Sequence, residues 1–248
     1  MEKNFKITIE YDGTPFSGWQ IQNNRSTVQG EIEKSLSQIL NQKIKINGSG
    51  RTDAGVHALG QTANFFAATS ISCIDLKKGV NSIINGPIVI KKCETVNSDF
   101  HARYSAVSKE YHYHILNRPD PCAVGKNYIW HIEKELDVDQ MNKCCRFITG
   151  IHDCKSFEGA GSPRSHTIRK IFFSSVEKSE KDRIIFKIKA NGFLRFMARN
   201  IMGTLVSAGL SKISPDDFKK ILKAKNRNAA GMTAPPQGLF LIRVNYTP

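Results

Sequence analysis

The residue types best suited to chemistry gather in one short segment, Gly48 to Ala58. It holds three glycines, an arginine, an aspartate and a histidine. Glycines let a backbone approach a ligand closely, and a carboxylate such as Asp53 can accept a proton or stabilise developing positive charge. A second interpretation stays open, in which Asp53 only hydrogen-bonds to amides of its own turn, and the spacing alone favours that second interpretation.

Motifs of several common cofactor and hydrolase classes are absent from the sequence. The pair Gly48 and Gly50 lacks the third glycine of a dinucleotide-binding fingerprint, and no helical pattern follows it directly. A Walker lysine, an H-E-x-x-H helix and a G-x-S-x-G elbow are also missing. These absences remove the dinucleotide interpretation and several common cofactor and hydrolase classes, and no metal site is predicted.

A strand pattern places His112 and His114 on one face and Tyr111 and Tyr113 on the other. Two histidines at this spacing can bind a metal, but no third ligand is suggested nearby. Sheet surface is therefore the favoured interpretation of the histidines, and the pattern does not decide which face is buried.

Two arginines four residues apart, Arg195 and Arg199, form a row on a predicted helix. Such a row is either solvated charge or a pair that faces an anion or a carboxylate, and the spacing does not choose between them. The same helix has an apolar row that predicts core packing: Phe193, Met197, Ile201 and Leu205.

The elements that must position these residues follow one order in the first half of the chain. Alternating apolar residues predict a strand over 5–11, a helix follows with Ser26 and Gln29 as its capping box, and Ile44 and Ile46 mark a short strand. A strand over 61–66, a helix capped by Asp75 and a strand over 88–90 complete a β-α-β-β-α-β order, the ferredoxin-like unit.

The second half repeats this order with an unrelated sequence. The patterns predict strands over 107–116, 168–176, 183–190 and 239–245, and helices from Asp137, over 193–208 and over 216–224. We predict an α+β protein of two halves, 1–103 and 104–248, in which helices cover one face of an antiparallel sheet and a central cleft lies at the seam.

Composition indicates the class of partner. The 248 residues include 36 Lys and Arg against 22 Asp and Glu, a formal charge of +14, which favours a polyanion such as nucleic acid. Solvated surface charge is the alternative. Six cysteines without paired spacing predict reduced thiols, and no stretch reads as a secretion signal or a membrane span, so we expect a cytoplasmic location.

Together, several motifs resemble the TruA family of transfer RNA pseudouridine synthases. The strongest are Y-D-G-T-P-F-S-G-W-Q at 11–20 and G-R-T-D-A-G-V-H at 50–57. Four later motifs follow in the family's order: F-H-A-R-Y at 100–104, K-E-Y-H-Y at 109–113, M-A-R-N-I-M-G at 197–203 and G-L-F-L at 238–241. The resemblance spans nearly the whole chain and implies the pseudouridine synthase fold, two ferredoxin-like halves that form a continuous sheet with a central cleft.

The resemblance also implies a reaction and its residues. The family isomerises uridine to pseudouridine in the anticodon stem-loop of tRNA, at positions 38 to 40, without a cofactor. Asp53 matches the essential aspartate, which acts as nucleophile or as base, and Arg199 matches its arginine partner. Tyr111 matches the tyrosine that packs on the target base, and Arg51 matches the arginine that helps to extrude the nucleotide.

RNA contacts and partners are implied in the same way. The residues expected to contact RNA are Tyr111, Phe100, His101, Ala102, Arg103, Tyr104, Arg164, Ser165, His166, Thr167 and Ile168. The family resemblance further implies a homodimer that seats one tRNA. Two other hypotheses are a non-catalytic RNA-binding protein, and an enzyme that depends on a metal or a thiol.

Overall fold

The computed structural model describes residues 1–159, 161, 166–180 and 182–247, and these form two compact units. The first unit is Met1–Val107 together with Phe240–Pro248, and the second is Ser108–Leu239. The predicted halves divide the chain once, after residue 103. In the structure the end of the chain belongs to the first unit, because its strand pairs there.

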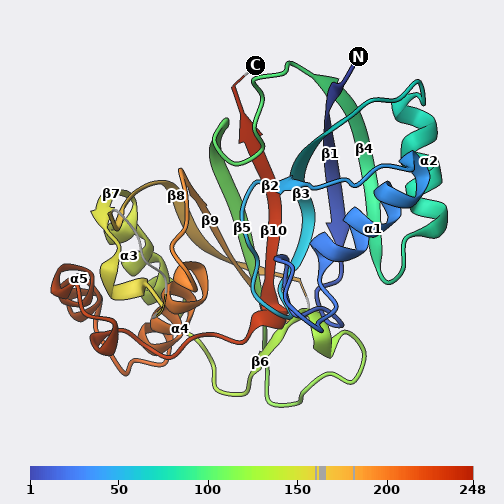
Figure 1. Cartoon of the computed structure of the whole chain (residues 1–248). Coiled ribbons are helices and arrows are strands. Elements are labelled where there is room, and N and C mark those ends of the chain that lie inside the picture. Colours follow the sequence, from blue (N-terminus) through green and yellow to red (C-terminus); the bar gives the residue numbers. More distant parts are fainter. Residues whose placement is uncertain (160, 162–165, 181, 248) are drawn as a thin grey trace. The chain divides into compact units, whose positions relative to one another are not determined.

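The first unit is built on a sheet in which β1 lies between β4 and β3 and is antiparallel to both (Figure 1). Short β2 adds to β3, and β10 pairs in parallel with the start of β3 through Phe240 and His57. The strands are β1 (Lys3–Tyr11), β2 (Asn47–Gly48), β3 (His57–Ala67), β4 (Ile88–Val96) and β10 (Leu239–Tyr246). This arrangement positions the Gly48 to Ala58 segment between β2 and β3.

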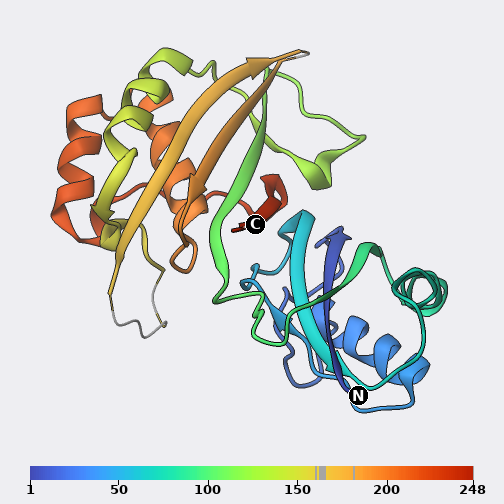
Figure 2. The ribbon, with the colours of Figure 1, turned by 90° about the horizontal axis from the view of Figure 1, so that it is seen from above.

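Two helices, α1 (Val28–Leu40) and α2 (Cys73–Ile83), cover one face of this sheet (Figure 2). Both begin at a side-chain cap that differs from the predicted one: Thr27 caps α1, and Ser72 caps α2. The predicted caps at Ser26 and Asp75 are wrong by one and three residues. The error arises because several Ser, Thr and Asp residues near each start are competent caps.

The second unit contains an antiparallel sheet in the order β5, β9, β8, β7, with β6 parallel to β5. Its strands are β5 (Ala106–Asn117), β6 (Trp130–Ile132), β7 (Gly150–Asp153), β8 (Ile168–Ser179) and β9 (Arg183–Ala190). Its helices are α3 (Val138–Ile148), α4 (Met197–Gly209) and α5 (Pro215–Ala224), which lie together on one side of that sheet (Figure 2). The helix α3 begins at the predicted cap, Asp137.

The predicted α+β class is confirmed, and both halves show the predicted order of elements along the chain. The first reads β1, α1, β2, β3, α2, β4, and the second contains β5, α3, β8, β9, α4 and finally β10, with β6, β7 and α5 as additions. The prediction that the two halves form one continuous sheet with a central cleft depends on the placement of the two units, and it stays a prediction. In the described part of the chain, no helix has the length and apolar character to cross a membrane.

Three further predicted boundaries are wrong, and the first is the strand predicted over 61–66, which begins at His57. Ile44 and Ile46 are buried but form no strand, because their amides donate to side chains of α1: Ile44 N to Ser37 Oγ at 3.0 Å and Ile46 N to Glu33 Oε1 at 2.9 Å. The helix predicted from Phe193 begins only at Met197, because Phe196 has the left-handed φ of 59°.

Candidate active site

Asp53 lies in the irregular segment between β2 and β3, and its side chain is partly exposed. The Asp53 carbonyl accepts a hydrogen bond from Val56 N at 3.2 Å, and Gly55 inside this turn has φ 75°. A left-handed φ is readily adopted by glycine. The Asp53 backbone carbonyl therefore closes this turn, and the role of its carboxylate stays a prediction.

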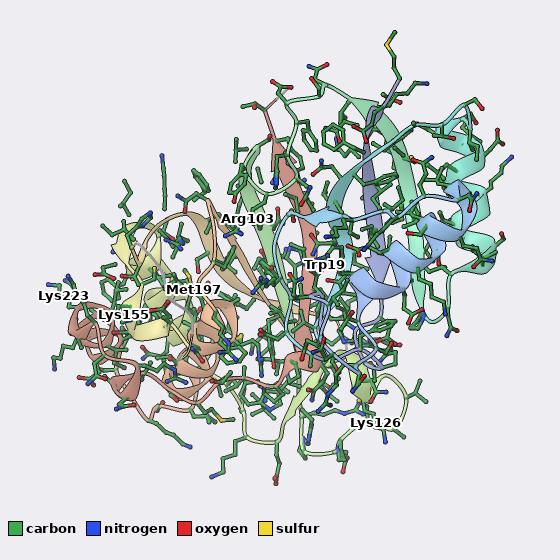
Figure 3. All side chains as sticks on the ribbon, in the orientation of Figure 1. Trp19, Arg103, Lys126, Lys155, Met197 and Lys223 are labelled. Atoms are coloured by element: carbon green, nitrogen blue, oxygen red, sulfur yellow. The ribbon has the colours of Figure 1, made fainter. Side chains whose placement is uncertain are left out.

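The segment 11–20 holds the Asp53 turn in place. Trp19 N donates to the Thr52 carbonyl at 3.1 Å, and the Tyr11 phenol lies 2.7 Å from Thr52 Oγ1. Trp19 is almost fully buried, and Figure 3 labels its position in the first unit. The residue before Asp53 is thus fixed both through its backbone and through its side chain.

Gly18 makes this contact sterically feasible. It has φ 96°, and a Cβ there would lie 2.7 Å from the Thr52 carbonyl oxygen and 3.1 Å from Ala54 N. A side chain at position 18 would therefore push the Asp53 turn away. The glycine belongs to the same motif as Trp19, which gives that motif a physical role in positioning Asp53.

Both ends of the segment are pinned to the sheet. At its start, Ser49 Oγ donates to Gln61 Oε1 at 2.6 Å, and Gln61 Nε2 donates to the Gly50 carbonyl at 3.0 Å. At its end, His57 is buried and its ring stacks on Phe240 with centroids 4.7 Å apart. The turn that carries Asp53 is thereby held between two fixed points.

His57 Nδ1 faces two partners that require opposite protonation. Gly13 N approaches it at 3.1 Å as a donor, and Asp12 Oδ1 lies 3.0 Å away as an acceptor. A neutral Nδ1 without a proton accepts from Gly13, whereas a protonated Nδ1 donates to Asp12. In either state the histidine ties the end of the Asp53 segment to the end of β1.

Arg51 is exposed two residues before Asp53. Its Nε donates to Gln20 Oε1 at 3.0 Å. A long cationic side chain held at one nitrogen can still reach a phosphate or a base with its other nitrogens.

Tyr111 lies on β5 in the second unit, and its strand shows which face is buried. The tyrosine face packs inward, with Tyr111 7% exposed and Tyr113 fully buried. The Tyr111 ring meets Phe193 edge to face, with centroids 4.8 Å apart at 74°. On the other face His112 Nε2 lies 3.0 Å from Glu110 Oε1.

Arg199 lies in the first turn of α4 and is partly exposed. Its Nε donates to the Ala234 carbonyl at 2.8 Å, and its guanidinium lies over the Phe196 ring at 5.0 Å. Arg195 lies over the same ring at 4.7 Å, so the two arginines converge on one aromatic side chain. Burial raises the pKa of Tyr113, and the positive charge of Arg199 acts in the opposite direction.

The segment 100–104 combines a buried residue that is hydrogen-bonded to the first unit with side chains that are exposed. Ala102 is fully buried, its amide donates to Asn64 Oδ1 at 2.9 Å, and its carbonyl accepts from the Tyr246 phenol at 2.8 Å. Tyr104 is 75% exposed and has Arg103 over its ring at 5.5 Å. Phe100 and His101 are partly exposed, and RNA contact by this segment stays a prediction.

The remaining expected RNA contacts lie before β8. Arg164 and Ser165 lie outside the described residues. His166 is exposed, Thr167 donates from its hydroxyl to the Asp153 carboxylate, and Ile168 is 50% exposed. Across the described ranges, no group of three or more His, Cys, Asp and Glu side chains is arranged to hold a metal ion.

Comparison with known proteins identifies the family. A family model described as tRNA pseudouridine synthase matches residues 7–105 and 145–247. The chain belongs to the tRNA pseudouridine synthase family. Asp53, Arg51 and Arg199 lie within the matched ranges, and Tyr111 lies between them.

Two curated relatives extend the similarity over nearly the whole chain. The tRNA pseudouridine synthase A of Thermoanaerobacter sp. (strain X514) is 44% identical over 244 residues, covering 98% of this chain and 100% of the relative. The enzyme of the same name from Ruminiclostridium cellulolyticum is 40% identical with the same coverage. These alignments include the interval that contains Tyr111, since they span 98% of this chain.

Solved structures resemble the chain less closely. The crystal structure of a Cbf5-Nop10-Gar1 complex matches with a TM-score of 0.41 and 14% identity, covering 97% of this chain and 48% of that one. A likeness at this level supports no argument about the site.

Several residues that position the candidate site were not found from the sequence. Thr52 and Gly18 act on Asp53 through contacts between segments far apart along the chain, which periodicity does not encode. Ala234 binds Arg199 through its backbone carbonyl, which any residue type supplies. The available signal was indirect: the family motif at 11–20, which contains Gly13 and Gly18, precedes the aspartate motif.

Proposed function

We propose that this chain isomerises uridine to pseudouridine in the anticodon arm of tRNA, at positions 38 to 40. The observation that carries the proposal is the full-length similarity, 44% identity over 98% of the chain, to an enzyme named tRNA pseudouridine synthase A. Family membership supplies the reaction class and tRNA as substrate. The anticodon arm and the residue roles below are the finer steps of the proposal.

The reaction is an isomerisation, so every atom of the substrate is kept. The N1–C1′ bond of uridine breaks, the uracil turns, and a C5–C1′ bond forms, while C5 gives up a proton and N1 gains one. No oxidant or reductant is consumed. The chemical demands on the protein are to stabilise positive charge at C1′, to hold the free base and to move protons.

Asp53 is proposed as the essential carboxylate. An ionised carboxylate can attack C1′, or accept a proton from C2′, and either route requires a fixed position. The contacts of Thr52 with Tyr11 and Trp19 support this role, because they hold the backbone directly before Asp53.

Arg199 and Tyr111 are proposed to act with Asp53, with Arg199 keeping the carboxylate ionised and Tyr111 packing on the target base. Arg199 is held by the Ala234 carbonyl and the Phe196 ring, and Tyr111 rests on Phe193. These contacts hold both side chains in position before substrate binds, so less conformational entropy is lost on reaching the transition state. Arg51, exposed beside Asp53, is proposed to occupy the space left by the extruded nucleotide.

RNA binding is proposed to use the cationic surface. A formal charge of +14 favours the phosphate backbone through release of counterions. Arg103 and the exposed ring of Tyr104 offer one cation and one stacking surface side by side. We further propose that the enzyme is a cytoplasmic homodimer and works without a cofactor.

Conversion of uridine in an unmodified tRNA tests the proposal. Purified protein, without added cofactor, is incubated with the transcript, and pseudouridine is mapped by position for the wild type and for Asp53→Asn. We expect product in the anticodon arm with the wild type and none with the variant. Wild-type protein that binds the tRNA tightly but forms no pseudouridine would support the non-catalytic RNA-binding hypothesis instead.

A second arm of the same assay separates the residue roles from folding. Asp53→Asn keeps the size of the side chain and removes only the charge, so its thermal unfolding should match that of the wild type. Loss of activity together with loss of folded protein would count against Asp53 as the reacting group.

A further inference from the structure

Within the described part of the chain, Arg227 donates four hydrogen bonds, all of them to uncharged oxygens. Its Nη1 donates to the carbonyls of Ala230 at 3.3 Å and Gly231 at 2.9 Å, and its Nη2 donates to Asn200 Oδ1 and Thr233 Oγ1, both at 3.1 Å. The side chain is half-buried, and this burial lowers the pKa of Arg227. Partial burial of a cation carries a free-energy cost of desolvation, and the hydrogen bonds to these oxygens offset that cost.

These bonds close the segment 227–234 into a fixed shape against α4. Thr233 Oγ1 donates to Asn200 Oδ1 at 2.6 Å, and Gly231 N donates to Thr204 Oγ1 at 2.9 Å. The contact is close, because a Cβ on Gly203 would lie 1.8 Å from the Met232 carbonyl oxygen. The segment therefore rests directly on the backbone of the helix.

The fixed segment ends at the residue that binds Arg199. Ala234 N donates to the Arg199 carbonyl at 3.1 Å, and Arg199 Nε donates back to the Ala234 carbonyl at 2.8 Å. Ala234 is fully buried, and Thr233 directly before it is one of the Arg227 contacts. Asn200, the other side-chain contact of Arg227, directly follows Arg199 on α4.

We propose that Arg227 is a positioning residue that holds the Arg199 guanidinium in place through Asn200, Thr233 and the Ala234 carbonyl. This rests on the proposed function, since it assigns Arg227 to the reaction in which Arg199 takes part. Arg227 binds both residues next to the Arg199–Ala234 pair, so loss of its fork loosens both sides of that pair. A shift of about 1 Å in a catalytic group can lower a rate by roughly a hundredfold.

Three variants isolate the effect. Arg227→Gln removes the charge and the fork, Arg227→Lys keeps the charge without the planar fork, and Thr233→Val removes one oxygen of the network at nearly constant volume. Arg118→Gln is the matched control, because Arg118 also binds carbonyl oxygens, those of Asp120 and Pro121, but in an exposed loop of the same unit.

Single-turnover conversion of tRNA uridine and equilibrium binding of the same tRNA are measured for each variant, per mole of folded protein. We expect all three variants to lower the rate constant by roughly tenfold or more and to change the binding constant by less than about twofold. The control should change neither. Full activity in Arg227→Lys would overturn the proposal, since it would show that charge, not position, is what matters.

Coupling to Arg199 distinguishes positioning from a general effect on folding. If Arg227 acts through Arg199, Arg227→Gln should change the rate by less than about twofold when Arg199 is already lysine. The same loss in both backgrounds would overturn the proposal, as would a wild-type rate per folded molecule. If Arg227→Gln does not fold, Thr233→Val answers the same question.

The wild type and Arg199→Lys in this assay separate two kinds of failure. A wild type without product would overturn the proposed function and this inference with it. A wild type that is active and slowed by Arg199→Lys, but unaffected by the Arg227 and Thr233 variants, would overturn this inference alone.

Discussion

The Tyr11 phenol oxygen and the Thr52 hydroxyl oxygen lie 2.7 Å apart, one residue before Asp53. Both side chains are buried, Tyr11 3% exposed and Thr52 8%. Burial raises the pKa of Tyr11, so the phenol stays protonated and can donate at neutral pH. The pair joins the end of β1 to the turn that carries the candidate catalytic carboxylate.

Tyr11→Phe should slow catalysis more than it affects tRNA binding. The change leaves Thr52 Oγ1 buried without this partner, which costs about 1 kcal/mol of folding free energy and loosens the backbone at Asp53. Single-turnover rates and urea unfolding measure the two effects. A Tyr11→Phe, Thr52→Val double variant should be no slower than Tyr11→Phe alone, and additive losses would contradict a shared role.

Gly18→Ala should disturb the Asp53 turn, and Gly125→Ala provides its matched control. Both glycines have a left-handed φ, 96° and 83°, so both changes carry a backbone cost of about 1 kcal/mol. A Cβ at Gly18 would lie 2.7 Å from the Thr52 carbonyl oxygen, whereas no atom of the described residues lies within 4 Å of a Cβ at Gly125.

We therefore expect both glycine variants to lose stability, and Gly18→Ala alone to lose most of its turnover. Thermal unfolding and pseudouridine formation are compared for the two proteins. Equal activities would show that the close approach of Gly18 to the turn does not matter for Asp53.

The sequence was most informative where one physical signal acts alone. The alternation in residues 5–11 predicts β1, because one face of that strand is buried and the other is not. The cap at Asp137 predicts the start of α3 for a similar reason: its side chain accepts from Gln140 N. In both cases the local pattern and the tertiary contacts favour the same structure.

Prediction failed where hydrogen bonds between residues far apart in the sequence outweigh the local sequence pattern. The Ile44 and Ile46 amides bind side chains of α1, so an alternating apolar pair forms no strand. At Phe196 the chain turns through a left-handed φ, and the Arg195 carbonyl accepts from Gly159 N at 2.8 Å, so the helix predicted from Phe193 begins only at Met197. The candidate residues Asp53, Arg199 and Tyr111 came from motifs, whereas Thr52 and Ala234, which hold them, could be found only from contacts.

Tyr111→Phe should act on turnover, and Tyr113→Phe should act on stability. The Tyr111 ring rests on Phe193, and phenylalanine keeps that contact, so we expect Tyr111→Phe to keep the packing of the ring and to lower the turnover through loss of the hydroxyl. Tyr113 donates to the Pro235 carbonyl at 2.7 Å, and its loss should cost about 1 kcal/mol of stability. Unfolding curves and initial rates test both; a destabilised Tyr111→Phe would indicate that its hydroxyl holds the fold and not the substrate.

The buried thiols should resist alkylation at pH 8, and catalysis should survive it. Burial raises the pKa of Cys145 and Cys154 to about 12 and that of Cys144 to about 11. Burial, with the charges of Cys73 and Glu94, raises the pKa of Cys93 to about 12. Because the thiolate is the reacting form, a pKa near 12 leaves roughly one thiol in ten thousand reactive at pH 8, and reactivity should rise with pH.

Iodoacetamide labelling followed by mass mapping measures this resistance in the native protein, with urea-unfolded protein at the same pH as the control in which every cysteine reacts. We expect Cys144, Cys145 and Cys154 to stay unlabelled and the labelled protein, assayed with a chelator present, to keep its turnover. Rapid labelling of these three residues with parallel loss of activity, in protein that still unfolds at the wild-type temperature, would favour the thiol-dependent hypothesis, because disrupted packing would lower activity and stability together.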